Sequence, residues 1–89
     1  MPRVAFTPQL QRFLDAPPRT VDGATVAAAL ARVFEDNPRL GTYVLDDHGH
    51  VRPHVAVFVG GARVKDRRGL SDPVDADAEI LVLQALSGG

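Results

Sequence analysis

One short loop holds the residue types most able to bind a metal ion. Four candidates stand close together in it: Asp46, Asp47, His48 and His50. Carboxylate and imidazole groups are both common zinc ligands. Loops rich in Asp, Gly and His are more often solvated turns, and two histidines one residue apart have no regular element to hold them. We therefore predict no metal site in this chain.

The sequence contains no cysteine, and its candidate serine nucleophiles are Ser71 and Ser87. A serine nucleophile needs an adjacent base, and it commonly stands in a sharp elbow motif. Neither serine is flanked by such a motif. The lack of cysteine also excludes a disulfide framework and a thiolate metal site. We expect no internal active site, and hence no enzyme.

The main run of cations is Lys65-Asp66-Arg67-Arg68, which an aspartate interrupts. The chain as a whole has a net charge of −1, which rules out a broad surface for polyanions. Such a run is usually a solvated loop, with an acidic rim of a partner protein as the functional alternative. Gly60-Gly61 indicates a hairpin turn rather than a phosphate site, because no helix follows it. No nucleic-acid partner is expected.

The chain ends in Ser87-Gly88-Gly89. Glycine has no Cβ, so a diglycine tail is thin and reaches conformations closed to other residues. An extended tail of this kind can enter a narrow channel of another protein and present its carboxylate there. A frayed terminus would look the same in isolation. The meaning of the diglycine therefore depends on the elements that precede it.

Composition favours one small soluble domain. Apolar residues make up 45% and charged residues 24% of the 89 positions, and a chain this long can build a single core. No apolar run approaches the ~18 residues of a membrane span, and the first residues lack the apolar centre of a signal peptide. We expect one domain over 1–89 with a flexible tail at 86–89, located in the cytoplasm and without a membrane partner.

The spacing of apolar residues predicts one helix and four or five strands. The helix is expected over 26–36, after an N-cap at Thr25 and before Pro38. Residues 40–45 are expected to hold a turn and a short strand. The strands are predicted at 3–6, 19–21, 54–59, 62–64 and 79–86.

A single amphipathic helix must lie across one face of the sheet. The sequence therefore predicts an α+β, ubiquitin-like β-grasp fold: a mixed sheet of four or five strands with one main helix on one face. The last strand is the most apolar and suits a central position. The residues expected to be buried are Val26, Leu30, Val33, Phe34, Val57, Ile80 and Val82.

Alternation along the strands leaves a second apolar group on the opposite face of the sheet. Phe58, Leu81 and Leu83 fall on that face if the valines of 55–59 point toward the helix. One helix cannot cover both faces, so grouped apolar residues there would mark a partner surface. Leu86 and Ser87, where the tail begins, are predicted to belong to the same surface.

Several stretches resemble the MoaD/ThiS family of ubiquitin-like sulfur carriers, in the family's order. They are 6–10 (FTPQL), 22–26 (DGATV), 55–61 (VAVFVGG), 69–70 (GL) with Pro73, 77–80 (DAEI) and 85–89 (ALSGG). The chain is most similar to the longer members, which carry a loop like 45–53 before the third main strand. It departs from them at Gly60, Asp77 and Gln84, where such carriers often have asparagine, glycine and a nearby proline.

The resemblance implies that Gly89 carries the reacting carboxylate and that Gly88 keeps the approach to it open. A partner adenylyltransferase would use ATP and Mg²⁺ to adenylate this carboxylate. A sulfur donor would then displace AMP and leave a thiocarboxylate, from which a downstream synthase takes sulfur. The chain itself would bind no cofactor. Molybdopterin, thiamine thiazole, cysteine and other sulfur metabolites all remain open as products, with cysteine or a specialised metabolite favoured by the longer loop.

A ubiquitin-like protein modifier, joined through Gly89 to lysines of target proteins, is the alternative. Its activation chemistry is the same, so the tail does not distinguish the two functions. Lys65 is the one lysine of the chain. That leaves little scope for lysine-linked chains and argues weakly against a polymerising modifier.

Overall fold

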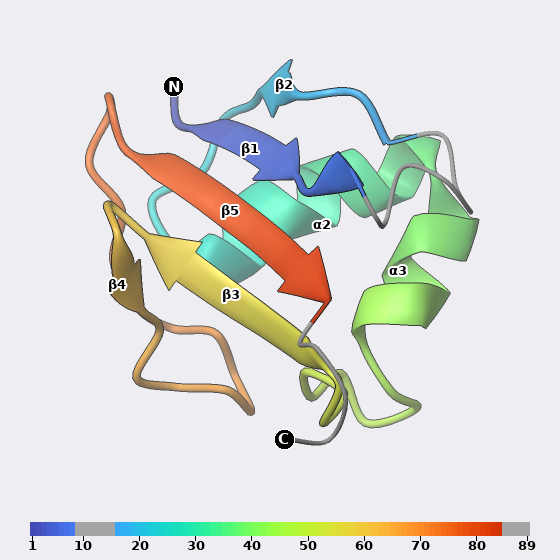
Figure 1. The fold of residues 1–89 in the computed structure, drawn as a ribbon. Coiled ribbons are helices and arrows are strands. Elements are labelled where there is room, and N and C mark those ends of the chain that lie inside the picture. The colour runs from blue at the N-terminus through green and yellow to red at the C-terminus, as the bar shows by residue number, and fades with distance from the viewer. Residues whose placement is uncertain (9–15, 85–89) are drawn as a thin grey trace.

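The computed structural model describes residues 1–8 and 16–84 (Figure 1). The predicted helix and strands occur in it, and one further helix is added. The elements are β1 (Arg3–Phe6), β2 (Arg19–Thr20), α2 (Val26–Asp36), α3 (Pro38–Val44), β3 (Val55–Val59), β4 (Ala62–Arg63) and β5 (Glu79–Gln84). The predicted α+β class is confirmed.

The five strands form one mixed sheet in the order β2-β1-β5-β3-β4. The apolar strand β5 is central, as predicted, and runs parallel to β1 and antiparallel to β3. In this register Val82 stands opposite Val57, and Ile80 stands opposite Val4. Because side chains alternate along a strand, these residues share one face of the sheet.

Helix α2 crosses that face and buries it, as Figure 1 shows behind β5 and β3. Six of the seven residues predicted to be buried are buried: Val26, Leu30, Val33, Val57, Ile80 and Val82. The seventh prediction, Phe34, is wrong, because this side chain is only half-buried. Its ring lies against Gly41 of α3, where a Cβ would come within 3.0 Å of the ring, so the ring packs between the two helices.

The connection at 65–73 closes the N-terminus of α2. The Thr25 hydroxyl accepts a hydrogen bond from the backbone N–H of Ala28 at 3.1 Å, which confirms the predicted N-cap. Two further N–H groups of the first turn, Val26 and Ala27, donate to the carbonyls of Asp72 and Leu70 at 3.0 and 2.9 Å. Backbone groups that a helix start leaves without partners are thus satisfied by a segment more than forty positions further along.

Helix α3 corrects the expectation of a turn and short strand at 40–45. Pro38 stands in its first turn, where the missing N–H costs nothing. The Asn37 side chain accepts from the backbone N–H of Leu40 at 3.4 Å, and Leu40 and Val44 are buried one turn apart. Pro38, which ends α2, also begins α3. A helix this short places only Leu40 and Val44 on its buried side, and two residues are too few to show a helical period in the sequence.

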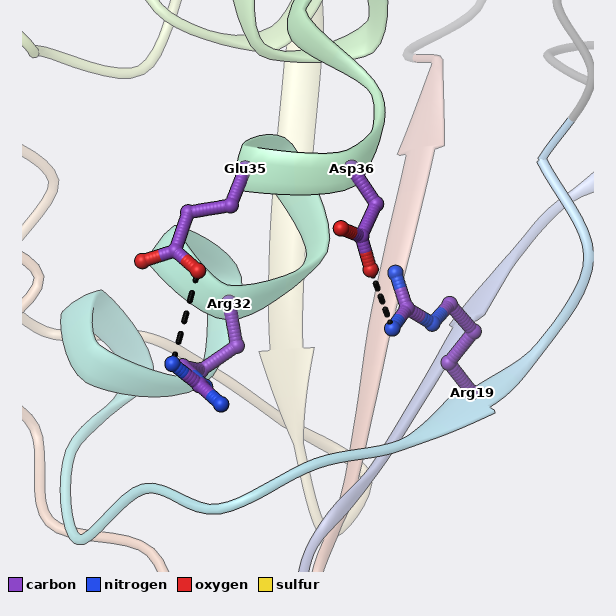
Figure 2. Close-up of polar contacts among 4 residues, drawn as sticks. All are labelled: Arg19, Arg32, Glu35 and Asp36. Carbon is purple, nitrogen blue, oxygen red and sulfur yellow. Dashed lines mark hydrogen bonds and ion pairs between the residues drawn. The ribbon is translucent and has the colours of Figure 1, made fainter.

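Two ion pairs lie on the outer side of α2 (Figure 2). Arg19 of β2 contacts Asp36 at 2.7 Å, and Arg32 contacts Glu35 at 3.4 Å. The first pair links the edge of the sheet to the last turn of the helix. All four side chains are substantially exposed, so each pair contributes at most about 1 kcal/mol.

Candidate functional site

The face of the sheet opposite α2 carries a group of apolar side chains. We call it the open-face patch and define it by Ala5, Ala56, Phe58, Leu81 and Leu83. The register brings its members together: Leu81 stands between Ala5 of β1 and Phe58 of β3, and Leu83 stands opposite Ala56. In Figure 1 this face of β1, β5 and β3 is turned toward the viewer, with no helix in front of it. The structure thus places Phe58, Leu81 and Leu83 on one face, as the alternation indicates.

The open-face patch is shallow, and polar groups border it. Phe58, Leu81 and Leu83 are half-buried and Ala56 is buried, and among the described residues Met1 is the only large apolar side chain that is exposed. The Arg63 guanidinium lies 5.7 Å from the centre of the Phe58 ring. At the other side, Arg3 and Glu79 form an ion pair at 2.7 Å. A flat apolar centre with a charged edge is the surface type that protein partners bury.

The predicted reacting group, Gly89, lies outside the described residues, as do Gly88, Leu86 and Ser87. The structure does describe the strand that leads to them. Strand β5 ends at Gln84, which stands opposite Val55 at the start of β3. Five residues follow Gln84 in the sequence, so the carboxylate of Gly89 lies at most ~18 Å from it.

In the Asp46–His50 loop, the Asp46 carboxylate accepts hydrogen bonds from backbone groups of the same loop. Asp46 accepts from the N–H groups of His48 and His50 at 2.9 and 3.0 Å. The bond from His50 is the largest effect that lowers the pKa of Asp46 below its usual value. In the described part of the chain, no group of three or more His, Cys, Asp or Glu residues is arranged to hold a metal ion. The loop is therefore a closed turn.

Asp66 is the centre of the 65–73 connection. Its carboxylate accepts from the Ser71 hydroxyl at 2.7 Å and from backbone N–H groups of Arg68, Gly69 and Ser71. The Ser71 hydroxyl is the first of these effects, and together they lower the pKa of Asp66 from 3.8 to about 2. Ser71, weighed as a nucleophile in the sequence, is therefore a structural donor.

Arg67 acts as a brace between this connection and the start of β3. Its guanidinium donates to the carbonyl oxygens of Arg52 and Val55, each at 3.0 Å. The expectation of a wholly solvated loop at 65–68 is therefore wrong for Arg67 and Asp66, whose side chains organise backbone. The hairpin at Gly60-Gly61 is as predicted, with φ of 57° and 86°.

A hollow that the sequence did not indicate opens beside α3. It has a volume of about 490 Å³ and is lined by Arg39, Thr42, Tyr43, Arg52 and His54. We call it the α3 hollow. Two residues come from the segment that enters β3 and three come from α3, so no local motif joins them. In the described part of the chain, no helix has the length and apolar character to span a membrane.

Solved structures provide the comparison that decides the fold. The small archaeal modifier protein 1 (SAMP1) of Methanosarcina acetivorans superposes with a TM-score of 0.80 at 18% identity, over 99% of this chain and 95% of that one. SAMP1 of Haloferax volcanii gives 0.75 at 25% identity, over 99% and 98%. A chain of the Amycolatopsis orientalis BexX/CysO complex gives 0.81 at 19% identity, over the full length of both.

The chain has the ubiquitin-like β-grasp fold. Two of these neighbours are small archaeal modifier proteins by name, and the third is a chain of the BexX/CysO complex. No protein-family model and no curated protein matches the chain. The β-grasp places the open-face patch and the end of β5 on the same sheet, so the candidate site consists of an apolar face and a strand that leads to the terminus.

Proposed function

We propose that this chain is a ubiquitin-like sulfur carrier whose working group is the carboxylate of Gly89. The observation that carries the proposal is the central strand β5, which contributes Leu81 and Leu83 to the open-face patch and then leads to Ser87-Gly88-Gly89. The full-length likeness to a chain of the BexX/CysO complex supports a protein that works in contact with a partner.

The chemistry assigns a simple part to this chain. A carboxylate oxygen of Gly89 attacks the α-phosphorus of ATP, and pyrophosphate leaves with the broken phosphoanhydride bond. Hydrosulfide then attacks the carbonyl carbon, the C–O bond to AMP breaks, and a thiocarboxylate remains. Where the donor is a persulfide, the acyl disulfide that forms first is cleaved by a thiol, which ends in a disulfide with the donor. The partner adenylyltransferase holds ATP and Mg²⁺. This chain supplies the carboxylate, the side-chain-free approach at Gly88 and the docking face.

The open-face patch is proposed as the surface that the adenylyltransferase binds. Aromatic and leucine side chains on a sheet without a helix in front of it offer area that a partner can bury. Phe58, Leu81 and Leu83 provide that area next to the strand that carries the tail. Leu86 and Ser87 continue the proposed contact toward the terminus.

The test is ATP-dependent pyrophosphate exchange with the adenylyltransferase of the same organism. Deleting Gly89 moves the terminal carboxylate back by up to ~3.6 Å, and a displacement of about 1 Å already costs roughly a hundredfold in a positioned reaction. We expect near loss of exchange on deletion of Gly89 and on extension by one residue, with unchanged thermal melts.

Arg32→Ala, on the outer side of α2, is the matched control and should exchange at the wild-type rate. Wild-type exchange that survives both changes at the terminus would remove Gly89 from the mechanism. It would also end the carrier and modifier interpretations together.

A protein modifier is the second candidate, because two of the structural neighbours are small archaeal modifier proteins by name. Activation would be identical, and the carbonyl of Gly89 would then be joined to a lysine amine with loss of AMP. Intact mass of the protein from its own host separates the two. Replacement of one oxygen by sulfur supports the carrier, and conjugates through lysine support the modifier.

A further inference from the structure

The α3 hollow holds two arginine side chains, Arg39 and Arg52, that form no ion pair in the described part of the chain. The Arg39 guanidinium forms no hydrogen bond or ion pair with any described residue. The Nε of Arg52 donates a hydrogen bond to the carbonyl oxygen of Thr42 at 2.9 Å. Arg52 also lines the adjoining hollow, together with Asp46 and Asp47, and forms no ion pair with either carboxylate. Two arginines and His54 therefore gather without a carboxylate partner.

The hollow is held in shape before any partner arrives. The rings of Tyr43 and His54 meet edge to face, with centroids 5.4 Å apart and planes at 87°. The Arg67 guanidinium holds the backbone on both sides of His54 by its hydrogen bonds to the carbonyl oxygens of Arg52 and Val55. Tyrosine and arginine are the side chains most enriched where binding energy concentrates at protein interfaces. A preorganised site of this composition fits a protein partner with acidic groups.

The position of the hollow ties it to the tail. His54 directly precedes Val55, whose opposite residue in the sheet is Gln84, the end of β5. The start of β3 and the lower end of α3 lie at the edge of the molecule toward which β5 points (Figure 1). The five residues that follow Gln84 span at most ~18 Å, so a protein that receives the carboxylate of Gly89 has the α3 hollow at the same end of the sheet.

We propose that the α3 hollow receives an acidic segment, with Asp or Glu carboxylates, of the adenylyltransferase that takes the tail. This inference rests on the proposed function and adds a second contact to it. The open-face patch supplies apolar area, and the hollow supplies charge that orients the end of the sheet from which the tail emerges. Charge pairs of this kind raise the rate of encounter and weaken as salt is added.

The experiment compares Arg39→Glu with Arg32→Glu in pyrophosphate exchange with the adenylyltransferase that accepts the wild-type chain. Both changes reverse one arginine charge on a helix. Arg32 lies on α2 beside Glu35 (Figure 2) and does not line the α3 hollow. We expect Arg39→Glu to raise the KM for the carrier about tenfold while kcat and the thermal melt stay unchanged. The salt dependence of KM should become shallower in Arg39→Glu only.

Each failure has its own signature. If the wild-type chain supports no exchange, the proposed function falls and this inference falls with it. If the wild-type chain exchanges but Arg39→Glu and Arg32→Glu share one KM, the hollow is not a docking site and the proposed function stands. Binding of inorganic phosphate to the free chain, seen as NMR shifts at Tyr43 and His54, together with an unchanged KM would reassign the hollow to a small anion.

Discussion

The two faces of the central strands carry apolar side chains alike, yet their environments differ. Toward α2, Val57, Ile80 and Val82 have no exposed surface. The next residue along the strand in each case lies on the opposite face and is half-buried: Phe58, Leu81 and Leu83. The same backbone thus carries two apolar layers, of which only one has a helix of the described chain in front of it.

The difference separates stability from recognition. Area that α2 removes from water drives folding of this chain, at roughly 25 cal/mol per Å². Area in the open-face patch adds less to folding and remains for a partner to bury. Substitutions on the two faces should therefore affect different measurements, and the predictions below test that separation.

The largest expected effect is on the covered face. Ile80→Ala removes a fully buried side chain from between β1 and β3 and should lower the free energy of unfolding by about 2–5 kcal/mol. Urea titration followed by circular dichroism measures it. Leu81→Ala, one position along on the open face, is the matched control and should cost clearly less. Equal losses would mean that the two faces are equally packed.

The open face should respond in binding instead. Leu83→Asp and Phe58→Asp should each weaken binding of the adenylyltransferase by about 2 kcal/mol or more, because a charge would enter the apolar centre of the contact. Calorimetric titration gives the affinity. Thr20→Asp adds the same charge on the same face at exposed β2 and should leave the affinity near wild type. An unchanged affinity in both patch variants would take the patch out of the interface.

A smaller effect is expected where the chain passes close to α2. A Cβ on Gly23 would lie 2.6 Å from the backbone nitrogen of Ala29, so Gly23→Ala forces the backbone to shift. Overpacking of this kind costs about 1–3 kcal/mol, measurable as a lower midpoint in urea. Ala28→Ser, at an exposed position of the same helix, is the control and should lose little. An unchanged urea midpoint for Gly23→Ala would show that the backbone at Gly23 can move away from Ala29 without loss of stability.

The smallest expected effect concerns the connection that closes the start of α2. The pKa of Asp66 is lowered from 3.8 to about 2, first by the Ser71 hydroxyl, so its ionised form is favoured in the folded state. The stability it contributes is complete above pH 3.8 and is lost as the pH falls toward 2. Asp66→Asn should melt lower than wild type at pH 7, and the two melting curves should converge between pH 4 and 2.

Asp47→Asn is the control for that titration, because the Asp47 carboxylate forms no hydrogen bond or ion pair with any described residue. Its melting temperature should follow the wild type across the pH range. A constant gap between wild type and Asp66→Asn down to pH 2 would mean that the hydrogen bonds of Asp66, rather than its charge, stabilise the connection.

Local patterns in the sequence were sufficient for much of the fold. Alternation along 54–59 and the apolar run within 79–86 identified both strands. Both faces followed, because the side chains of a strand alternate whatever surrounds it. Thr25 and Pro38 marked the ends of α2, because capping and the missing proline N–H act within one turn. The diglycine terminus and its resemblance to sulfur carriers likewise needed only the residues themselves.

Contacts between distant segments decided the rest. Pro38 could have ended one helix without starting another, and burial of Leu40 and Val44 against the core selects α3. The sequence predicted a solvated side chain for Arg67, whereas the fold brings its guanidinium to the carbonyl oxygens of Arg52 and Val55. The α3 hollow joins 39–43 to 52–54, and only packing of the helix against the entry to β3 could place them together, because no covalent spacing or periodicity links their side chains.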